Sequence, residues 1–186
     1  MDKDVSAGSG STVVAGRLAL GVTLLAFGIG TTGVIDGVAA ADAVSVARYV
    51  GGVALFLLGL LAFRDRDGAT GTGFTVLGAL WFTWAVTART SEHAAGLFLL
   101  LFALVALTLT LAGGDLPGRV THGLLFVSMT LLAVAAFAGS SPLVKAGGWA
   151  AVASGAVAWY AATAAPAHWP TAFPRRAAGR GVTATG

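Results

Sequence analysis

Long apolar segments alternate with short polar breaks along almost the whole chain. Six of these segments approach or exceed the roughly 20 mostly apolar residues that are needed to cross a bilayer. They cover residues 13–35, 43–63, 72–88, 94–113, 120–139 and 143–165. The breaks include RDRDGATG at 64–71 and GGDLPGR at 113–119, and such sequences end helices. The pattern therefore predicts an all-α integral membrane protein with six transmembrane helices in a compact bundle.

The composition agrees with a membrane protein. Charged residues make up 10% of the chain, whereas a soluble domain usually carries about 25%. Residues 1–12 are polar and rich in glycine and serine, and residues 166–186 are rich in proline and arginine. Neither end carries enough apolar surface to fold by itself. We therefore expect a disordered tail at 1–12, a transmembrane domain at 13–165 and a proline-rich basic tail at 166–186.

The distribution of Lys and Arg predicts how the helices are oriented. If both termini lie in the cytoplasm, eight of the eleven basic residues fall on the cytoplasmic side and three on the opposite side. Cytoplasmic loops are enriched in Lys and Arg, so the distribution predicts a multi-pass protein of the cell membrane with both termini inside. The basic residues form no stripe with interleaved aromatic rings, which argues against binding of nucleic acid.

The polar side chains inside the predicted spans are mostly hydroxyls. They are Thr23, Thr31, Thr32, Thr75, Thr83, Thr108, Thr110, Ser128, Thr130 and Ser154. Ion pumps and proton relays keep acidic, basic or histidine side chains at membrane depth, and the spans lack such a set. Hydroxyls suit the passage of a small polar solute, but in membrane helices they also bond to their own backbone or to a neighbouring helix. Both interpretations stay open at this point.

Patterns for catalysis and metal binding are missing from the sequence. It contains no cysteine, its three histidines (His93, His122 and His168) fall in separate segments, and none of the predicted spans contains a carboxylate. An active site needs such groups within reach of one another. We therefore predict no enzyme activity, no metal and no cofactor, and we expect the partners to be the lipid bilayer and a small solute.

Glycines recur at one spacing in three of the predicted helices. The pairs are Gly21 with Gly28, Gly52 with Gly59, and Gly148 with Gly155, each seven residues apart. Seven residues are about two helical turns, so each pair lies on one helix face. Small residues let membrane helices approach closely. We therefore predict that these glycines pack helix against helix.

Three stretches of the chain resemble the succinate–acetate permease family. They are GGVALFLLGLLAFRDRDGATGTGFTVLGALW at 51–81, GDLPGRVTHGLLFVSMTLL at 114–132 and GWAAVASGAVAWYAA at 148–162. The second stretch contains a Ser-x-Thr sequence at Ser128 and Thr130, and the third keeps Gly148, Trp149, Gly155, Ala156 and Tyr160. The resemblance covers about residues 17–165. It implies a six-helix bundle that assembles as a homo-oligomer, typically a hexamer, with one pore per protomer, and that moves small carboxylates such as acetate and succinate.

The chain also departs from the family pattern. The family begins its first helix with Asn-Pro-Ala-Pro-Leu-Gly-Leu, whereas GRLALGV at 16–22 keeps only Leu20 and Gly21 and adds Arg17. Leu55 stands where the family usually has a glutamine. The family's narrow apolar gate, commonly Phe, Tyr and Leu, corresponds here to Leu24 or Leu25, to Leu77 and to Met129. These residues are the expected pore constriction, and the expected solute path contains Leu20, Gly21, Thr75, Ser128 and Thr130.

The sequence therefore predicts a membrane channel or transporter for small carboxylates, either passive or proton-linked, with a hydroxyl-lined pore and a hydrophobic gate. A urea or amide channel is one alternative, because such channels are also six-helix oligomers, but those pores tend to contain buried carboxylates. The other alternative is a non-transporting membrane scaffold of the same fold, which the missing first-helix motif favours.

Overall fold

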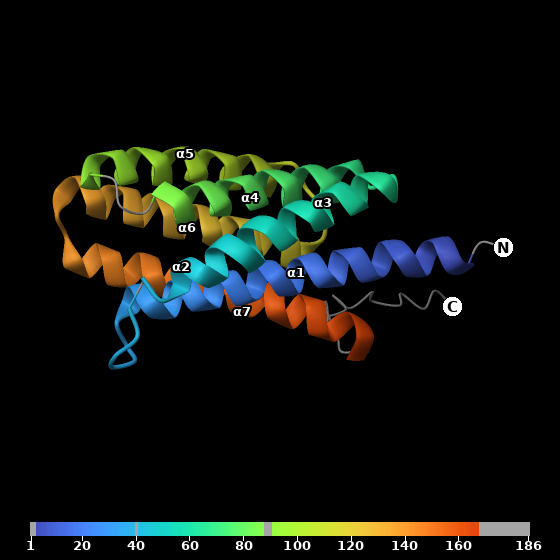
Figure 1. The fold of residues 1–186 in the computed structure, drawn as a ribbon, viewed down its shortest axis with the longest axis horizontal. Helices are drawn as coiled ribbons and strands as arrows, with labels where there is room; N and C mark the ends of the chain where they lie inside the picture. Colours follow the sequence, from blue (N-terminus) through green and yellow to red (C-terminus); the bar gives the residue numbers. More distant parts are fainter. Residues whose placement is uncertain (1–2, 40, 88–90, 168–186) are drawn as a thin grey trace, which may run out of the picture.

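The computed structural model describes residues 3–39, 41–87 and 91–167. Its helices are α1 (Lys3–Thr32), α2 (Ala43–Val46), the π-helix η1 (Ala47–Ala54), α3 (Leu55–Arg64), α4 (Gly68–Thr87), α5 (Glu92–Leu111), α6 (Leu116–Ala138) and α7 (Ser141–Ala167). Because α2, η1 and α3 follow one another without a break, the described residues form six long helical rods that lie side by side (Figure 1). The predicted all-α class is confirmed for this part of the chain, which contains no strand.

The structure differs from the predicted boundaries at both ends of the bundle. Helix α1 begins at Lys3, so the described residues of the expected disordered tail at 1–12 are helical, and α7 continues through Pro166 to Ala167. The rest of the expected basic tail, residues 168–186, lies outside the described residues.

Helices α4 and α6 also start earlier than expected, and side-chain caps explain both starts. The backbone N–H of Thr70 donates to the Asp67 carboxylate, and that of Gly118 donates to the Asp115 carboxylate, at 3.0 and 3.2 Å. Such caps satisfy the free N–H groups of a first helical turn. Pro117 lies within the first turn of α6, where proline is tolerated.

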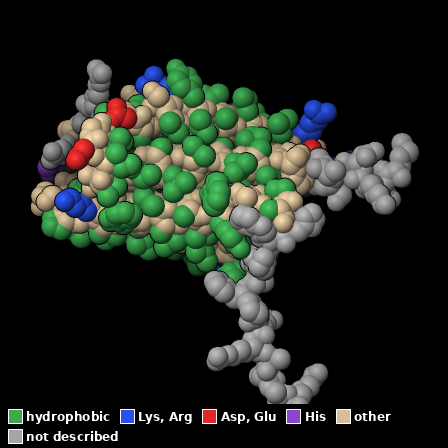
Figure 2. All heavy atoms as spheres, turned by 90° about the horizontal axis from the view of Figure 1, so that it is seen from below, with side chains coloured by type: hydrophobic (Ala, Val, Ile, Leu, Met, Phe, Trp, Pro, Cys, Tyr) green, Lys and Arg blue, Asp and Glu red, His purple; other side chains and the backbone are tan. Residues whose placement is uncertain are grey.

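The surface of the bundle has the character of a membrane protein. Among the described residues, four helical stretches are long and apolar enough to cross a bilayer: Gly10–Thr32, Ala43–Arg64, His93–Leu111 and Leu116–Ala138. Figure 2 shows hydrophobic side chains over the long side of the bundle, with charged side chains gathered at its two ends. We call these the Asp115 end, which holds the turns before α4 and α6, and the Asp42 end, which holds the loop between α1 and α2.

Glycines let α1 and α7 approach to backbone contact. A Cβ atom added to Gly28 would lie 2.7 Å from the carbonyl oxygen of Gly148, and one added to Gly155 would lie 2.9 Å from the carbonyl oxygen of Gly21. Atoms at these distances overlap, so a side chain at either position would force the two helices apart. The glycines predicted to share a face in the first helix thus meet those of the last helix in two antiparallel pairs.

A second glycine seam joins η1 and α3 to α4. Gly52 lies against Phe82, Gly78 lies against the backbone of Phe56, and Gly59 lies against Thr75. Each contact therefore puts a glycine of one helix against a larger residue of the other. At the Asp42 end of the same seam, the Arg48 guanidinium donates to the Ala85 carbonyl oxygen at 3.3 Å.

We expect Gly28→Ala to lower the stability of the protein by about 1–3 kcal/mol, because the new methyl group overlaps the α7 backbone. The matched control is Gly123→Ala on α6, where the nearest atom to an added Cβ is 3.7 Å away. That control should be neutral or stabilising by up to about 1 kcal/mol, the usual gain from replacing a helical glycine. Denaturant unfolding in detergent, followed by circular dichroism, measures both changes. Equal stability of the two variants would contradict the close α1–α7 contact.

Candidate functional site

A cavity of about 170 Å³ opens at the Asp115 end of the bundle. Residues from α1, α4, α5, α6 and α7 and from the turn before α6 line it, among them Arg17, Leu20, Phe74, Asp115, Thr121 and His122. Its wall is mainly apolar, with charged and polar groups gathered near Arg17 and Asp115. A space of this kind fits a small molecule that has one polar group and a short apolar part.

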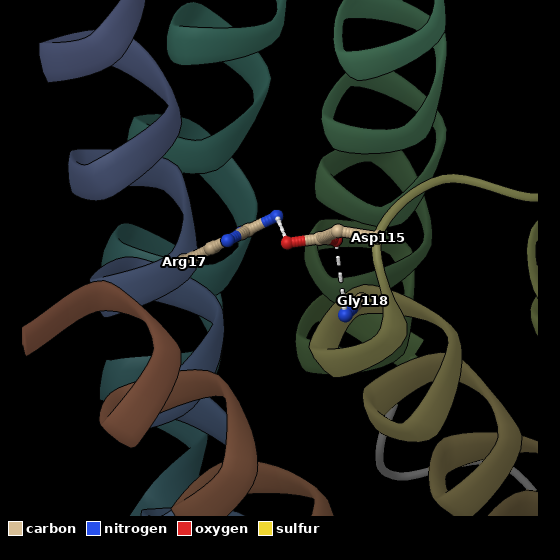
Figure 3. A network of polar contacts seen from close by, with 3 residues as sticks. All are labelled: Arg17, Asp115 and Gly118. Carbon is tan, nitrogen blue, oxygen red and sulfur yellow. Dashed lines mark hydrogen bonds and ion pairs between the residues drawn. The ribbon is translucent and has the colours of Figure 1, made fainter. Parts of the chain in front are cut away.

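Arg17 and Asp115 form an ion pair beside this cavity. The Arg17 Nη2 atom lies 2.7 Å from Asp115 Oδ2, and the two side chains are 26% and 47% exposed. The other carboxylate oxygen accepts from the Gly118 backbone N–H, so Asp115 caps α6 and holds Arg17 at the same time (Figure 3). Charge-assisted hydrogen bonds of this kind are short and directional. The pair ties α1 to the turn before α6 and places a guanidinium next to the cavity.

This pair, whose members are 98 residues apart, was not predicted from the sequence. A signal was nevertheless present. Arg17 shares its helix face with Leu20 and Leu24, three and seven residues further on, and both leucines are buried. An arginine on the buried face of a helix needs an acceptor, and the sequence alone did not show which one.

Beyond the cavity, the centre of the bundle is filled by apolar side chains. Leu20, Phe74 and Thr121 line the cavity, and one turn further along α1, α4 and α6 lie Leu24, Leu77 and Leu125. Met129 follows Leu125 by another turn on α6, and all four side chains are fully buried in one cluster. We call Leu24, Leu77, Leu125 and Met129 the apolar plug. Among the two residues predicted as alternatives, Leu24 lies in the plug, whereas Leu25 is half-buried and outside the cluster.

Leu55 belongs to the same buried cluster, so the position where the family usually has a glutamine is apolar and central in this chain.

Leu125 was not predicted as a site residue. It follows Thr121 and precedes Met129 by four residues each, and this spacing was a signal that could have identified it.

Most of the hydroxyls in the predicted spans donate to backbone carbonyl oxygens. Thr23, Thr31, Thr83, Thr108, Thr110 and Thr130 each donate to the carbonyl oxygen four residues earlier. Ser128 donates to the Gly147 carbonyl oxygen at 2.8 Å and Ser154 to that of Thr121 at 2.7 Å, so both join α6 to α7. Thr75 lies in the seam against Gly59, and its buried hydroxyl has no partner among the described residues. The hydroxyls of Ser128 and Thr130 therefore already donate hydrogen bonds to backbone carbonyl oxygens without a solute.

We expect Ser128→Ala to destabilise the protein by about 0.5–1.5 kcal/mol, the range for hydrogen bonds between membrane helices. Solute uptake by the folded protein should remain unchanged, because the hydroxyl already donates to Gly147. Thr130→Val is the matched control, since its hydroxyl bonds only within its own helix. Unfolding and uptake are measured on the same preparations. Loss of uptake by Ser128→Ala with unchanged stability would instead place this hydroxyl on the solute path.

The arrangement of these helices matches a solved channel. The chain is similar in fold to the bacterial acetate channel SatP. The TM-score is 0.77 at 22% sequence identity, over 84% of this chain and 92% of the channel chain. No family model matches the sequence, and no curated protein matches it. The likeness to SatP supports the predicted helical membrane fold.

Proposed function

We propose that this protein is a divergent six-span member of the succinate–acetate permease family and forms a channel for small carboxylates such as acetate. The observation that carries the proposal is a cavity with a guanidinium at one side, followed directly by an apolar plug, in a fold similar to that of the acetate channel SatP. We further propose that the Asp115 end and both termini face the cytoplasm and that the chain assembles as a homo-oligomer, as the family does.

The chemistry of the two parts supports small carboxylates. The Arg17 guanidinium attracts an anion to the cavity, and the cavity is large enough for a short-chain acid. The plug contains only apolar side chains, so it opens by transient wetting. An ion loses far more solvation energy than a neutral molecule on entering such a region. The protonated acid is therefore the species that crosses the plug, and its flux is linked to protons.

Uptake of labelled acetate by proteoliposomes tests the function. We expect uptake above that of protein-free liposomes, and we expect this difference to increase as the pH falls from 7 to 6, because the neutral fraction of a carboxylic acid then rises about tenfold. Uptake of succinate and lactate is compared at the same concentrations. Uptake of urea is measured as well, to test the alternative of a urea or amide channel. If acetate, succinate and lactate all enter no faster than in protein-free liposomes, the carboxylate function is excluded.

A non-transporting scaffold is the second candidate, and one observation favours it. The plug side chains are fully buried, and most of the hydroxyls are bonded to the backbone, so the described centre resembles a packed core. A scaffold would give normal folding and no uptake of any small solute. The uptake measurement therefore decides between the two candidates.

A further inference from the structure

The indole N–H of Trp81 is a buried donor without an acceptor. Trp81 lies on α4, its side chain is 1% exposed, and its Nε1 atom has no hydrogen-bond partner among the described residues. Buried tryptophan N–H groups usually find a partner, and a buried donor without one costs about 1–3 kcal/mol. An unpaired donor at such depth needs an explanation.

The surroundings of Trp81 form an aromatic cluster beyond the plug. Trp81 follows the plug residue Leu77 by four residues on α4, and Phe27 follows Leu24 by three residues on α1, so both aromatic residues lie one turn further from the Arg17 cavity. The Trp81 ring lies 5.3 Å from Phe27, 6.0 Å from Trp84 and 5.3 Å from Phe102, measured between centroids, in edge contacts. The rings of this cluster, from α1, α4 and α5, carry no charge, and among the described residues the Trp81 N–H has no acceptor. The Arg48 guanidinium lies one turn further along α4, where it donates to the Ala85 carbonyl oxygen.

We propose that the Trp81 Nε1–H group is a binding site for the solute on the far side of the plug, where it donates to the carbonyl oxygen of a protonated short-chain carboxylic acid. This inference rests on the proposed function and adds a site to it. The carbonyl oxygen supplies the missing acceptor, and the short alkyl group packs against the rings of Phe27 and Phe102. The rings themselves carry no charge, so a neutral acid binds among them at a lower desolvation cost than a carboxylate.

The competing explanation is that the N–H points at the face of a neighbouring ring. Such contacts exist but are much weaker than a hydrogen bond to oxygen. They would leave the indole proton insensitive to the solute. The two explanations therefore differ in a signal that can be measured directly.

Nitrogen-15 NMR of the indole groups in nanodiscs tests the site without relying on transport. The Trp81→Phe variant identifies the Trp81 signal, and acetate is titrated at about pH 6, where the neutral fraction of the acid is about tenfold higher than at pH 7. We expect the Trp81 indole proton to shift downfield and to saturate, while the signals of Trp149 and Trp159, half-exposed side chains of α7, stay in place. A Trp81 signal that stays in place up to the highest acetate concentration used in the uptake measurement overturns the proposal in favour of the ring-face contact.

Uptake by the variants provides the second readout. Trp81→Phe keeps an aromatic ring and removes the donor, and we expect it to raise the KM for acetate about three- to tenfold. Trp149→Phe, at an exposed position on α7, is the matched control and should behave as wild type. Wild-type uptake together with an unchanged KM for Trp81→Phe overturns the site and leaves the channel function intact. Absence of wild-type uptake overturns the channel function, and the NMR titration then decides the site by itself. If Trp81→Phe fails to fold, single Phe variants of the other four tryptophans assign their signals and leave the remaining one to Trp81.

Discussion

Leu24→Ala is expected to raise acetate uptake about tenfold, which corresponds to a barrier lower by about 1.4 kcal/mol. Leu24 is fully buried in the plug between the Arg17 cavity and the aromatic cluster around Trp81. Truncation to alanine removes apolar volume from the narrowest part of the proposed path, so that wetting becomes easier. Leu25→Ala is the matched control, because Leu25 is the next residue on the same helix but is half-buried and outside the cluster.

The same pair of variants separates gating from stability. Leu24→Ala should cost about 2–5 kcal/mol of folding free energy, the usual range for a buried leucine, and Leu25→Ala should cost less. Uptake is normalised to the folded protein that is reconstituted in the liposomes. A rise in uptake for Leu25→Ala and not for Leu24→Ala would show that the constriction lies on the other face of α1, as the alternative alignment with the family predicts.

The sequence was sufficient to predict the long helices, because their apolar segments are long and the polar breaks between them contain charged residues, glycine or proline. Seven-residue spacing also showed that Gly21 and Gly28 share a helix face, but this spacing does not identify the partner helix. The structure provides that information, since Gly21 meets Gly155 and Gly28 meets Gly148. Residue spacing shows which residues of one helix share a face. It does not show which face of which other helix packs against them, because that helix can be distant in the chain.

The site residues were harder to predict for the same physical reason. A hydroxyl is recognisable in the sequence, but whether it bonds to a solute or to a carbonyl oxygen depends on the neighbouring backbone. Ser128 and Ser154 each find a carbonyl oxygen across the α6–α7 contact. Trp81 is the converse case, because its unpaired N–H is apparent only once the rings around it are in place. Likewise, the sequence of the π-helix η1 shows no pattern that distinguishes it from an α-helix.

Substitutions of the Arg17–Asp115 pair are expected to change acetate uptake in opposite directions. Asp115→Asn removes the charge that neutralises Arg17, and its amide oxygen can still accept from the Gly118 N–H and cap α6. We expect it to raise uptake at low acetate concentration about three- to tenfold, within the range for electrostatic attraction into clefts. Arg17→Gln leaves Asp115 unneutralised at the mouth of the cavity and should lower uptake about tenfold.

The opposite signs distinguish capture of the anion from a structural tie. Both substitutions break the same hydrogen bond, and each should cost only about 0.2–1 kcal/mol of stability, because the pair is partly exposed. A structural tie would therefore change uptake in the same direction in both variants. Acetate is almost entirely ionised at pH 7. If Arg17 captures this anion, the difference in uptake between the two variants should also become smaller in high salt, because salt screens charges that are more than a few ångströms apart. Equal uptake by both variants and wild type would show that acetic acid enters from solution in its neutral form, and the Arg17 cavity would then have no part in selecting the solute.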